Sequence, residues 1–485
     1  MARLKNLTPA ENVAGQHFDT IIIGSGFGSG FFLLEALKHK RTGRVLLLEW
    51  GEIRSHAEQM EAGAHSAIKP GTTYTNSSAK PWNFTIGFGG GTNCWFGQTP
   101  RFHPSDFRLH SLYGVGRDWP FDYAELEPYY CEAEEVMAIS GDEDMAAVLP
   151  RSRPFPQPAH ILSTPDAMLK KARKDMHFAM PTARARLATD SRPACCANLR
   201  CTLCPIDAKF TANNSLTGVF EHPSVTFCAG ARVDHLETEN GLVRSVHFET
   251  GTGSHTVSGD LIVLGANAIH SPAILLRSGI GSGLTGRGLH EAYGIEAEVM
   301  LDGIDNFDGS TITTGLDYGA YDGPFRKTSG SALLYFENRW KFGFRPETGR
   351  WRQTLPIVIV VEELPRDGDR IELDPNGQPH VIGEAPSAYA RDGAERAFNL
   401  LPEILAALPV ERIEKRGVRP TESHLQGSLR MGTDPARSVV DHNQIHHVCR
   451  NLAVVGSSVF PSCSAANPSL TVAAMSLRAG RSLLA

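Results

Sequence analysis

The stretch FDTIIIGSGFGSGFFLLEAL, residues 18–37, carries the strongest structural signal in the chain. Residues 18–23 are largely apolar and β-branched, as is typical of a buried strand. Four glycines follow within residues 24–30, and the apolar run 31–34 then has the pattern of a helix. Glycine permits a tight turn and the close approach of a pyrophosphate to the free N–H groups at a helix N-terminus. The stretch therefore predicts an α/β domain that binds a dinucleotide.

A second apolar strand supports this interpretation. Residues 44–48 (RVLLL) end at Glu49, roughly twenty residues beyond the glycine turn, where a carboxylate can accept hydrogen bonds from an adenosine ribose. Ser29 occupies the third glycine position of the usual pattern, and a residue this small still permits helix–strand packing. This fingerprint does not separate NAD from FAD.

Composition limits the class of protein. The chain has 485 residues, of which 41% are hydrophobic and 21% charged, which predicts a large core and two domains. The formal charge of -6 argues against nucleic-acid binding. No apolar run approaches the length of a membrane span, and the polar N-terminus does not resemble a signal peptide. We therefore expect a cytoplasmic protein.

Longer motifs identify a family. Residues 87–97 read GFGGGTNCWFG, and residues 118–130 read DWPFDYAELEPYY. Near the C-terminus, HLQG (424–427), RMG (430–432) and NPSLT (467–471) follow in order, with DP, NL and SSVFP between them. Together these motifs resemble the glucose-methanol-choline (GMC) flavoenzymes over about residues 18–483, and the likeness weakens around 135–190 and 290–420.

The resemblance implies the architecture and the cofactor. We expect an α/β fold in which a Rossmann-like domain binds FAD and a second domain, an antiparallel sheet with helices on one side, meets the substrate. The FAD-binding domain would comprise residues 15–100, 195–285 and 422–485. The substrate domain would comprise residues 101–194 and 286–421. Within the latter, residues 355–361 and 370–373 have the pattern of strands.

The resemblance also implies the site residues. Loss of a hydride from an alcohol carbon requires loss of the hydroxyl proton, and histidine is the natural base near neutral pH. The family places this role on His424, with Asn467 bonding the substrate oxygen. Residues implied to contact FAD are Gly24, Gly26, Phe27, Gly28, Glu49, Gly90, Gly91, Thr92, Asn93, Cys94, Val233, Ala266, Ser458, Asn467, Pro468 and Ser469.

Three further features have competing interpretations. Cys94 stands where some relatives carry a covalent flavin link, although we expect a buried structural thiol. His442, His446 and His447 could suggest a metal site, but we expect a solvated loop. Four cysteines crowd into ten residues, a density that favours metal or redox chemistry over a disulfide framework. Some GMC sugar dehydrogenases bind an iron–sulfur cluster through a similar element, and the alternatives here are zinc, a redox disulfide or idle thiols. The candidate ligands are Cys195, Cys196, Cys201 and Cys204.

The sequence thus predicts an FAD-dependent dehydrogenase that oxidises an alcohol group of a sugar, glycoside or aminoglycoside-like polyol by hydride transfer to flavin N5. Its partners would be that small molecule and an external electron acceptor. One alternative is an O₂-using oxidase of the pyranose-oxidase type. The other is an electron-transfer flavoprotein module without alcohol chemistry, which the His424/Asn467 pair disfavours.

Overall fold

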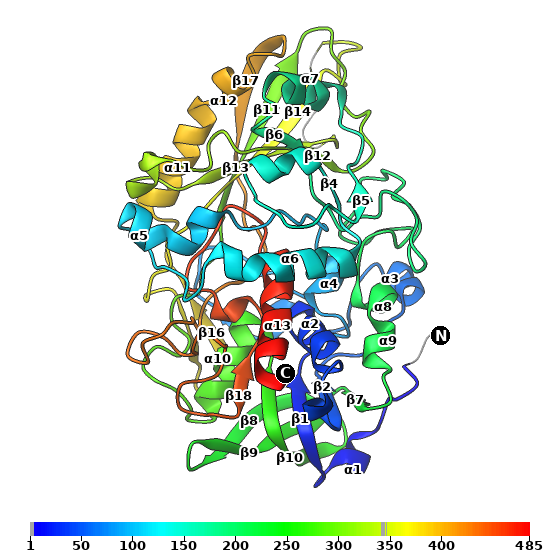
Figure 1. Cartoon of the computed structure of the whole chain (residues 1–485), viewed down its shortest axis with the longest axis vertical. Coiled ribbons are helices and arrows are strands. Elements are labelled where there is room, and N and C mark those ends of the chain that lie inside the picture. The colour runs from blue at the N-terminus through cyan, green and yellow to red at the C-terminus, as the bar shows by residue number, and fades with distance from the viewer. Residues whose placement is uncertain (1–3, 341–344, 346) are drawn as a thin grey trace.

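The computed structural model describes residues 4–340, 345 and 347–485. Two β-sheets dominate it (Figure 1). Strands β1, β2 and β7–β10 lie at one end of the molecule, and β6, β11–β14 and β17 lie at the other. Helix α6 (Tyr123–Met137) lies across the middle of the molecule, between the two ends. The functional site can therefore be sought where the two sheets face each other.

The first sheet has a parallel core in the order β7-β2-β1-β10-β18. Its central strands are buried on both faces, which explains their unbroken apolar sequences. The predicted strand, glycine turn and helix are confirmed, as is the strand that ends at Glu49. The bounds are β1 (His17–Ile23), β2 (Val45–Glu49), β7 (Val225–Ala229), β10 (Gly253–Leu264) and β18 (Leu452–Val454).

An antiparallel extension continues this sheet. The first half of β10 pairs with β9 (Leu242–Thr250), which pairs in turn with β8 (Arg232–Glu239). The pairing of β8 with β9 shifts register between Val233 and His235, so Asp234 is an extra residue in β8. Such a bulge changes the direction in which neighbouring side chains point.

Several helices pack around the first sheet. Helix α2 (Phe27–Ala36) packs against the C-terminal helix α13 (Ser469–Leu484), and α13 packs against α6. Gly480 makes the close approach of α13 to α2 feasible, because a Cβ at this position would lie 3.2 Å from the carbonyl oxygen of Phe32. Helix α10 (Asn267–Arg277) packs on β8.

The second sheet is antiparallel, in the order β17-β11-β14-β13-β12-β6. Alternation divides its side chains between two faces. Leu334 and Ile359 pack with residues of helices α11 (Ala388–Asn399) and α12 (Leu401–Ile404), whereas Tyr335 and Val358 line a cavity on the other face. The strands are β6 (His177–Ala179), β11 (Tyr293–Leu301), β12 (Thr313–Asp317), β13 (Ala332–Glu337), β14 (Thr354–Val361) and β17 (Val410–Val418).

Smaller elements complete the fold, and the predicted α/β class with a second, antiparallel sheet is confirmed. The predicted strand at residues 370–373 is present, but it belongs to a separate three-stranded sheet. Within the described ranges, no helix is long and apolar enough to cross a membrane. The remaining strands are β3 (Thr75–Asn76), β4 (Ser140–Gly141), β5 (Gln157–Pro158), β15 (Arg370–Leu373) and β16 (Pro379–Ile382); the remaining α-helices are α1 (Ala10–Val13), α3 (His56–Ala62), α4 (Gly91–Cys94), α5 (Leu109–Tyr113), α7 (Thr164–Ala172), α8 (Ala212–Ser215) and α9 (Thr217–Phe220).

Candidate active site

A cavity of about 700 Å³ is lined by residues from both sheets. It extends from the glycine turn after β1 to the N-terminus of α13. Most of the predicted site residues line it, which brings together segments from seven separate parts of the sequence. The predicted residues in its wall are Gly24, Gly26, Phe27, Gly28, Glu49, Gly90, Gly91, Cys94, Val233, Ala266, His424, Asn467, Pro468 and Ser469.

Two glycines of the first turn are required by backbone packing. A Cβ at Gly24, which has φ +91°, would lie 2.7 Å from the carbonyl oxygen of Gly265. A Cβ at Gly28 would lie 2.7 Å from the amide nitrogen of Gly456, in the loop after β18. At Gly26 the nearest atom to such a Cβ is 3.9 Å away, so this glycine leaves room for a ligand. Helix α2 begins here without a side-chain cap, and its first N–H groups are therefore available to an anion.

Glu49 closes the turn from the opposite side. Its carboxylate accepts hydrogen bonds from the amide and hydroxyl of Ser25, at 3.0 and 2.6 Å, and from the amide of Gly51 at 3.0 Å. Burial raises the pKa of this carboxyl, although these donors oppose the shift. Glu49 thus braces the glycine turn while it lines the cavity.

Three predicted contact residues, Thr92, Asn93 and Ser458, do not line the cavity. Thr92 and Asn93 are buried behind the second glycine loop, where they bond the carbonyl oxygens of Gly89 and Phe88 at 2.7 Å. They shape that loop instead of forming the cavity wall. The expectation that Cys94 is a buried structural thiol is wrong, because Cys94 is half-buried and lines the cavity.

The two predicted catalytic residues lie side by side. Asn467 Nδ2 is 3.0 Å from His424 Nε2, and both side chains line the cavity. With the amide in this orientation Nδ2 donates and Nε2 accepts, so the ring proton belongs on Nδ1. The resulting neutral imidazole directs a lone pair towards the position where the amide now lies. A hydroxyl placed between the two groups could donate to Nε2 and accept from Nδ2.

The surroundings of His424 keep its ring neutral. Its pKa is lowered to about 3, mainly by burial and also by the positive charges of Arg419 and Lys80. The backbone amide of His424 donates to Glu291 Oε2 at 3.2 Å, and Glu291 also pairs with Lys80 at 2.8 Å. These contacts fix the backbone that carries the imidazole, and the ring is available as a base at neutral pH.

Sequence reasoning missed Tyr335, which contacts the catalytic pair from β13. Its hydroxyl is 3.0 Å from Asn467 Oδ1 and 3.1 Å from the carbonyl oxygen of Ala465. A hydroxyl that donates to Oδ1 directs Nδ2 of the same amide towards His424. Nothing local in the sequence signals this contact, because Tyr335 on β13 and Asn467 in the loop before α13 are 132 residues apart.

Other polar side chains line the same cavity. Arg419 pairs with Glu422 at 2.9 Å, and Arg339 pairs with Glu337. Glu337 also accepts a hydrogen bond from Thr313, which in turn accepts one from Gln98 at 2.9 Å. These positively charged, negatively charged and neutral groups offer both hydrogen-bond donors and hydrogen-bond acceptors. A ligand rich in hydroxyl groups requires both. Sequence reasoning identified none of them.

The cysteine-rich segment lies outside helices and strands, and its four thiols form no disulfide. Cys201 is buried, Cys195 and Cys204 are half-buried, and Cys196 is exposed. Burial raises the pKa of Cys201, and the nearby charges of Arg184 and Lys209 oppose the shift. Residues 195–204 are described throughout, and no three metal-ligating atoms among them lie close enough together to hold a single ion as they stand.

Lys209 joins this segment to the cavity wall. Its buried ammonium group donates to the carbonyl oxygens of Asn93 and Trp95 at 2.7 Å and to that of Thr202 at 3.0 Å. Burial lowers its pKa to about 8, and the thiols of Cys94 and Cys201 oppose the shift. Lys209 therefore fixes the end of helix α4, at Cys94, to the cysteine-rich segment.

The three C-terminal histidines form no metal site by the same criterion. His442 is exposed, as expected of a solvated loop. His446 is not, because only 2% of its surface is exposed, and burial lowers its pKa to about 4. Its Nδ1 accepts from the amides of Val448 and Cys449, so it has a structural role in this turn.

Comparison with known proteins agrees with this arrangement. The family model described as GMC oxidoreductase matches in two parts, residues 120–293 and 377–476, which together cover more than half of the chain. The crystal structure of pyridoxine 4-oxidase from Mesorbium loti superposes with a TM-score of 0.69 at 20% identity, over 96% of this chain and 99% of that one. This likeness concerns the fold.

Two curated relatives match over almost their full length. The large subunit of fructose dehydrogenase from Gluconobacter japonicus is 28% identical over 96% of this chain and 97% of its own length. The 6'''-hydroxyparomomycin C oxidase of Streptomyces lividus is 28% identical over 100% of this chain and 98% of its own length. With the family model, the fold and the glycine turn in agreement, the chain belongs to the GMC oxidoreductase family of FAD-dependent enzymes.

Proposed function

We propose that the protein is an FAD-dependent dehydrogenase that oxidises an alcohol group of a sugar, glycoside or aminoglycoside-like polyol. The observation that carries the proposal is the pair formed by His424 and Asn467 in the wall of the large cavity. The family membership and the names of the two curated relatives support the choice of substrate class.

The residues of the cavity fit FAD. Gly26 leaves space beside the uncapped start of α2, where a pyrophosphate would accept hydrogen bonds from backbone N–H groups. Val233 and Glu49 would line the adenosine end. Helix α13 also begins without a side-chain cap at Pro468, and the positive end of its dipole would stabilise negative charge in the cavity. FAD, when bound, supplies the acceptor for the hydride.

The chain's own part in the reaction is to remove a proton and to hold an oxygen. The substrate hydroxyl would replace the direct hydrogen bond between Asn467 Nδ2 and His424 Nε2, which must move apart to admit it, and would donate to the imidazole and accept from the amide. Transfer of the proton to Nε2 leaves an alkoxide, from which a hydride departs far more readily than from an alcohol. Tyr335 would keep the amide turned towards the oxygen throughout.

The polar lining supports a polyol over a simple apolar alcohol. The ion pairs Arg339–Glu337 and Arg419–Glu422 offer several fixed donors and acceptors within one cavity. Each hydroxyl of a sugar loses hydrogen bonds to water on binding, and such groups can replace them. An apolar alcohol would leave these charged groups without a new partner.

We further propose that the cysteine-rich segment would hold an iron–sulfur cluster, which would supply one-electron chemistry between the flavin site and an external acceptor. Cys195, Cys201 and Cys204 would be the ligands, because Cys196 is exposed. The fit rests on three features: the thiols are free, two cations lie near Cys201, and Lys209 fixes the segment to the end of helix α4, at Cys94.

An oxidase that passes its electrons to O₂ remains the second candidate. The name of the Streptomyces relative favours it, since that protein is an oxidase. The two candidates share the substrate half-reaction and differ only in how the reduced protein is reoxidised.

A visible spectrum of the purified protein tests the proposal. We expect a yellow protein that releases FAD on denaturation and whose flavin absorbance bleaches anaerobically when a suitable sugar or aminoglycoside is added. Bleaching by simple aliphatic alcohols alone, or release of NAD, would contradict it. Admitting O₂ or a one-electron acceptor then separates the candidates, because the dehydrogenase should regain its colour quickly only with the acceptor. Iron and sulfide analysis of anaerobically purified protein tests the cluster, with Cys201→Ser as the variant.

A further inference from the structure

A group of metal-ligating side chains lies on the antiparallel part of the first sheet. In the register of β8 and β9, His235 stands directly opposite His247, and Glu237 stands opposite Ser245. Residues two apart on a strand share a face, so His235, Glu237 and His247 project from the same side. None of them belongs to the cavity described above.

The bulge in β8 produces this arrangement. Without the extra residue, Asp234 and not His235 would stand opposite His247. The bulge also brings the carboxylate of Asp234 within 2.9 Å of His235 Nδ1. A second contact, at 3.2 Å from Arg277 Nε, holds that carboxylate in place. The sheet is therefore irregular at the position that assembles the group.

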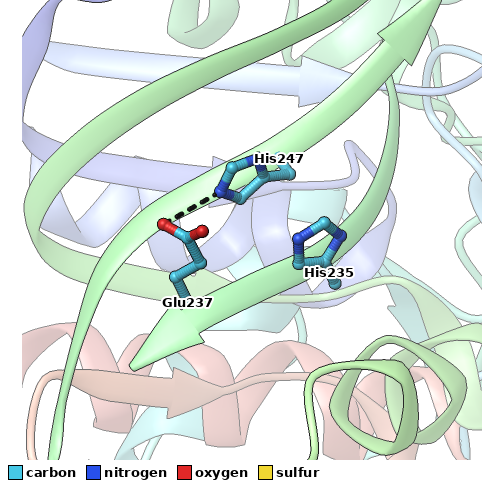
Figure 2. A group of neighbouring side chains, drawn as sticks. All are labelled: His235, Glu237 and His247. Atoms are coloured by element: carbon cyan, nitrogen blue, oxygen red, sulfur yellow. Dashed lines mark ion pairs between the residues drawn. The ribbon is translucent and has the colours of Figure 1, made fainter. Parts of the chain in front are cut away.

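The three side chains offer one ligand atom each within 4.8 Å of one another. His247 Nε2 lies 3.2 Å from Glu237 Oε2, and the two imidazoles stack with their centroids 4.3 Å apart at an angle of 6° (Figure 2). Figure 2 shows the carboxylate of Glu237 beside the ring of His247, with His235 on the neighbouring strand. The side chains of His235, His247 and Glu237 are 37%, 24% and 61% exposed, so an ion could reach them from solvent.

In both rings the contacts of Nδ1 suit metal binding through Nε2, and an ion at His247 Nε2 would displace the Ser245 hydroxyl, which lies 3.0 Å away. His235 Nδ1 faces Asp234, and His247 Nδ1 faces the hydroxyl of Thr256 on β10 at 3.1 Å. When Nδ1 of each ring carries the proton, Nε2 presents a lone pair. Metal-bound histidines usually donate their second N–H to a carboxylate or another oxygen in this way, which fixes the tautomer and the ring.

We propose that His235, Glu237 and His247 form a binding site for a divalent transition metal ion of the zinc type. Two imidazole nitrogens and one carboxylate oxygen suit Zn²⁺ and its neighbours, whereas Ca²⁺ and Mg²⁺ prefer oxygen ligands alone. The three protein ligands leave a coordination position for water or another exogenous ligand. The ion would tie β8 to β9.

Binding requires a small movement of the rings. The lone pairs of the two imidazoles lie in nearly parallel ring planes, so each ring must turn towards the other about its Cβ–Cγ bond for both to reach one ion. Partly exposed side chains can make such a rotation, and the strand register need not change. The ion would take the place of the direct contact between His247 Nε2 and Glu237 Oε2.

A zinc titration tests the site. The FAD-loaded protein is first stripped of metal with a chelator, and Zn²⁺ binding is then measured by calorimetry. Since the cysteine-rich segment can also bind zinc, the informative quantity is a difference between variants. The wild type should bind one more equivalent of Zn²⁺ than the double variant His235→Asn/His247→Asn. His255→Asn, a change on the adjacent strand β10, should keep that equivalent.

A second variant excludes a trivial loss of structure. Thr256→Val removes only the oxygen that faces His247 Nδ1 and should weaken zinc binding roughly tenfold, the usual effect of losing such a partner. Each variant must retain its flavin spectrum. Equal zinc stoichiometry in the wild type and the double histidine variant would overturn the proposal, as would unchanged affinity in Thr256→Val.

Discussion

At the scale of single residues, the site depends on three side chains that hydrogen-bond in series. Tyr335 contacts Asn467, and Asn467 contacts His424. Each comes from a separate segment, so the geometry exists only in the folded chain. The imidazole supplies the base, the amide holds the oxygen, and the phenol orients the amide.

Replacing the base should stop chemistry without removing the cofactor. We expect His424→Ala to slow reduction of the flavin by substrate at least about a hundredfold, the lower range for loss of a general base. Asn467→Ala should slow it less. Anaerobic stopped-flow measures both rates. The exposed His442→Ala is the control, and a His424→Ala protein that reduces at the wild-type rate would remove His424 from the mechanism.

The role of Tyr335 is to orient and not to react. Tyr335→Phe should lower the rate of flavin reduction about tenfold, which corresponds to losing one hydrogen bond of roughly 1.4 kcal/mol. The variant should change the rate of flavin reduction more than it changes the affinity for substrate. Tyr318→Phe is a matched control, because the buried hydroxyl of Tyr318 has no hydrogen-bond partner in the described structure. Equal effects in the two variants would mean that Tyr335 only fills space.

The environment of His424 predicts a pH dependence. Its folded pKa of about 3 lies below its ordinary value of 6.5, so the folded protein favours the neutral ring. As the pH falls from 6.5 towards 3, only the unfolded chain takes up a proton at this histidine. The free energy of unfolding therefore decreases over that range. Between pH 7 and 5 the base stays neutral, and flavin reduction should change less than about twofold. A pH profile by stopped-flow that falls with an apparent pKa of 6 to 7 would contradict this.

At the scale of elements, the β1–turn–α2 unit could be predicted because its signal is local. Strand, glycines and helix follow one another within residues 18–37, although the residues that they pack against, such as Gly265 and Gly456, lie far away in the sequence. The C-terminal motif likewise located His424 and Asn467. The structure added what depends on long-range pairing: the bulge at Asp234, the contact of Tyr335 with Asn467, and the position of Thr92 behind the cavity wall. Sequence patterns within one element contain no information on such registers.

Two glycines of the turn should respond differently to the same change. Gly26→Ala places a methyl group in ordinary van der Waals contact with Gly90, without a clash, so the fold should keep its stability within about 1 kcal/mol while FAD affinity falls at least about tenfold. Gly28→Ala drives a methyl group against the amide of Gly456 and should destabilise the fold itself. Flavin content and urea unfolding of the apoproteins measure the two effects. If Gly26→Ala retains normal FAD content, the pyrophosphate does not lie at this position.

At the scale of the whole molecule, the cavity lies between two halves, one built on the parallel sheet and the other on the antiparallel sheet. Its wall takes Glu49 from the parallel sheet and Gly24 and Ala266 from the loops that follow its strands β1 and β10. From the antiparallel sheet it takes Tyr335, Val358 and Val360. The two sheets have different architectures, and the apolar cluster of the first sheet continues onto the cavity-facing side of the second, at Leu333, Val358 and Val360. A cofactor that fills the cavity would touch both halves at once.

FAD should therefore stabilise the molecule as a whole. A ligand that binds only the folded state at a hundred times its dissociation constant adds about 2.7 kcal/mol. With an unfolding entropy of about 2.1 cal/mol/K per residue, this raises the midpoint of a 485-residue chain by about 3 °C. Calorimetry of apoprotein and FAD-loaded protein measures the shift. The Gly26→Ala apoprotein should melt like the wild-type apoprotein but gain much less on addition of FAD. A single transition that moves upward with FAD would show that both halves unfold together around the cofactor. Two transitions, of which only one responds, would restrict FAD to one half and contradict a shared wall.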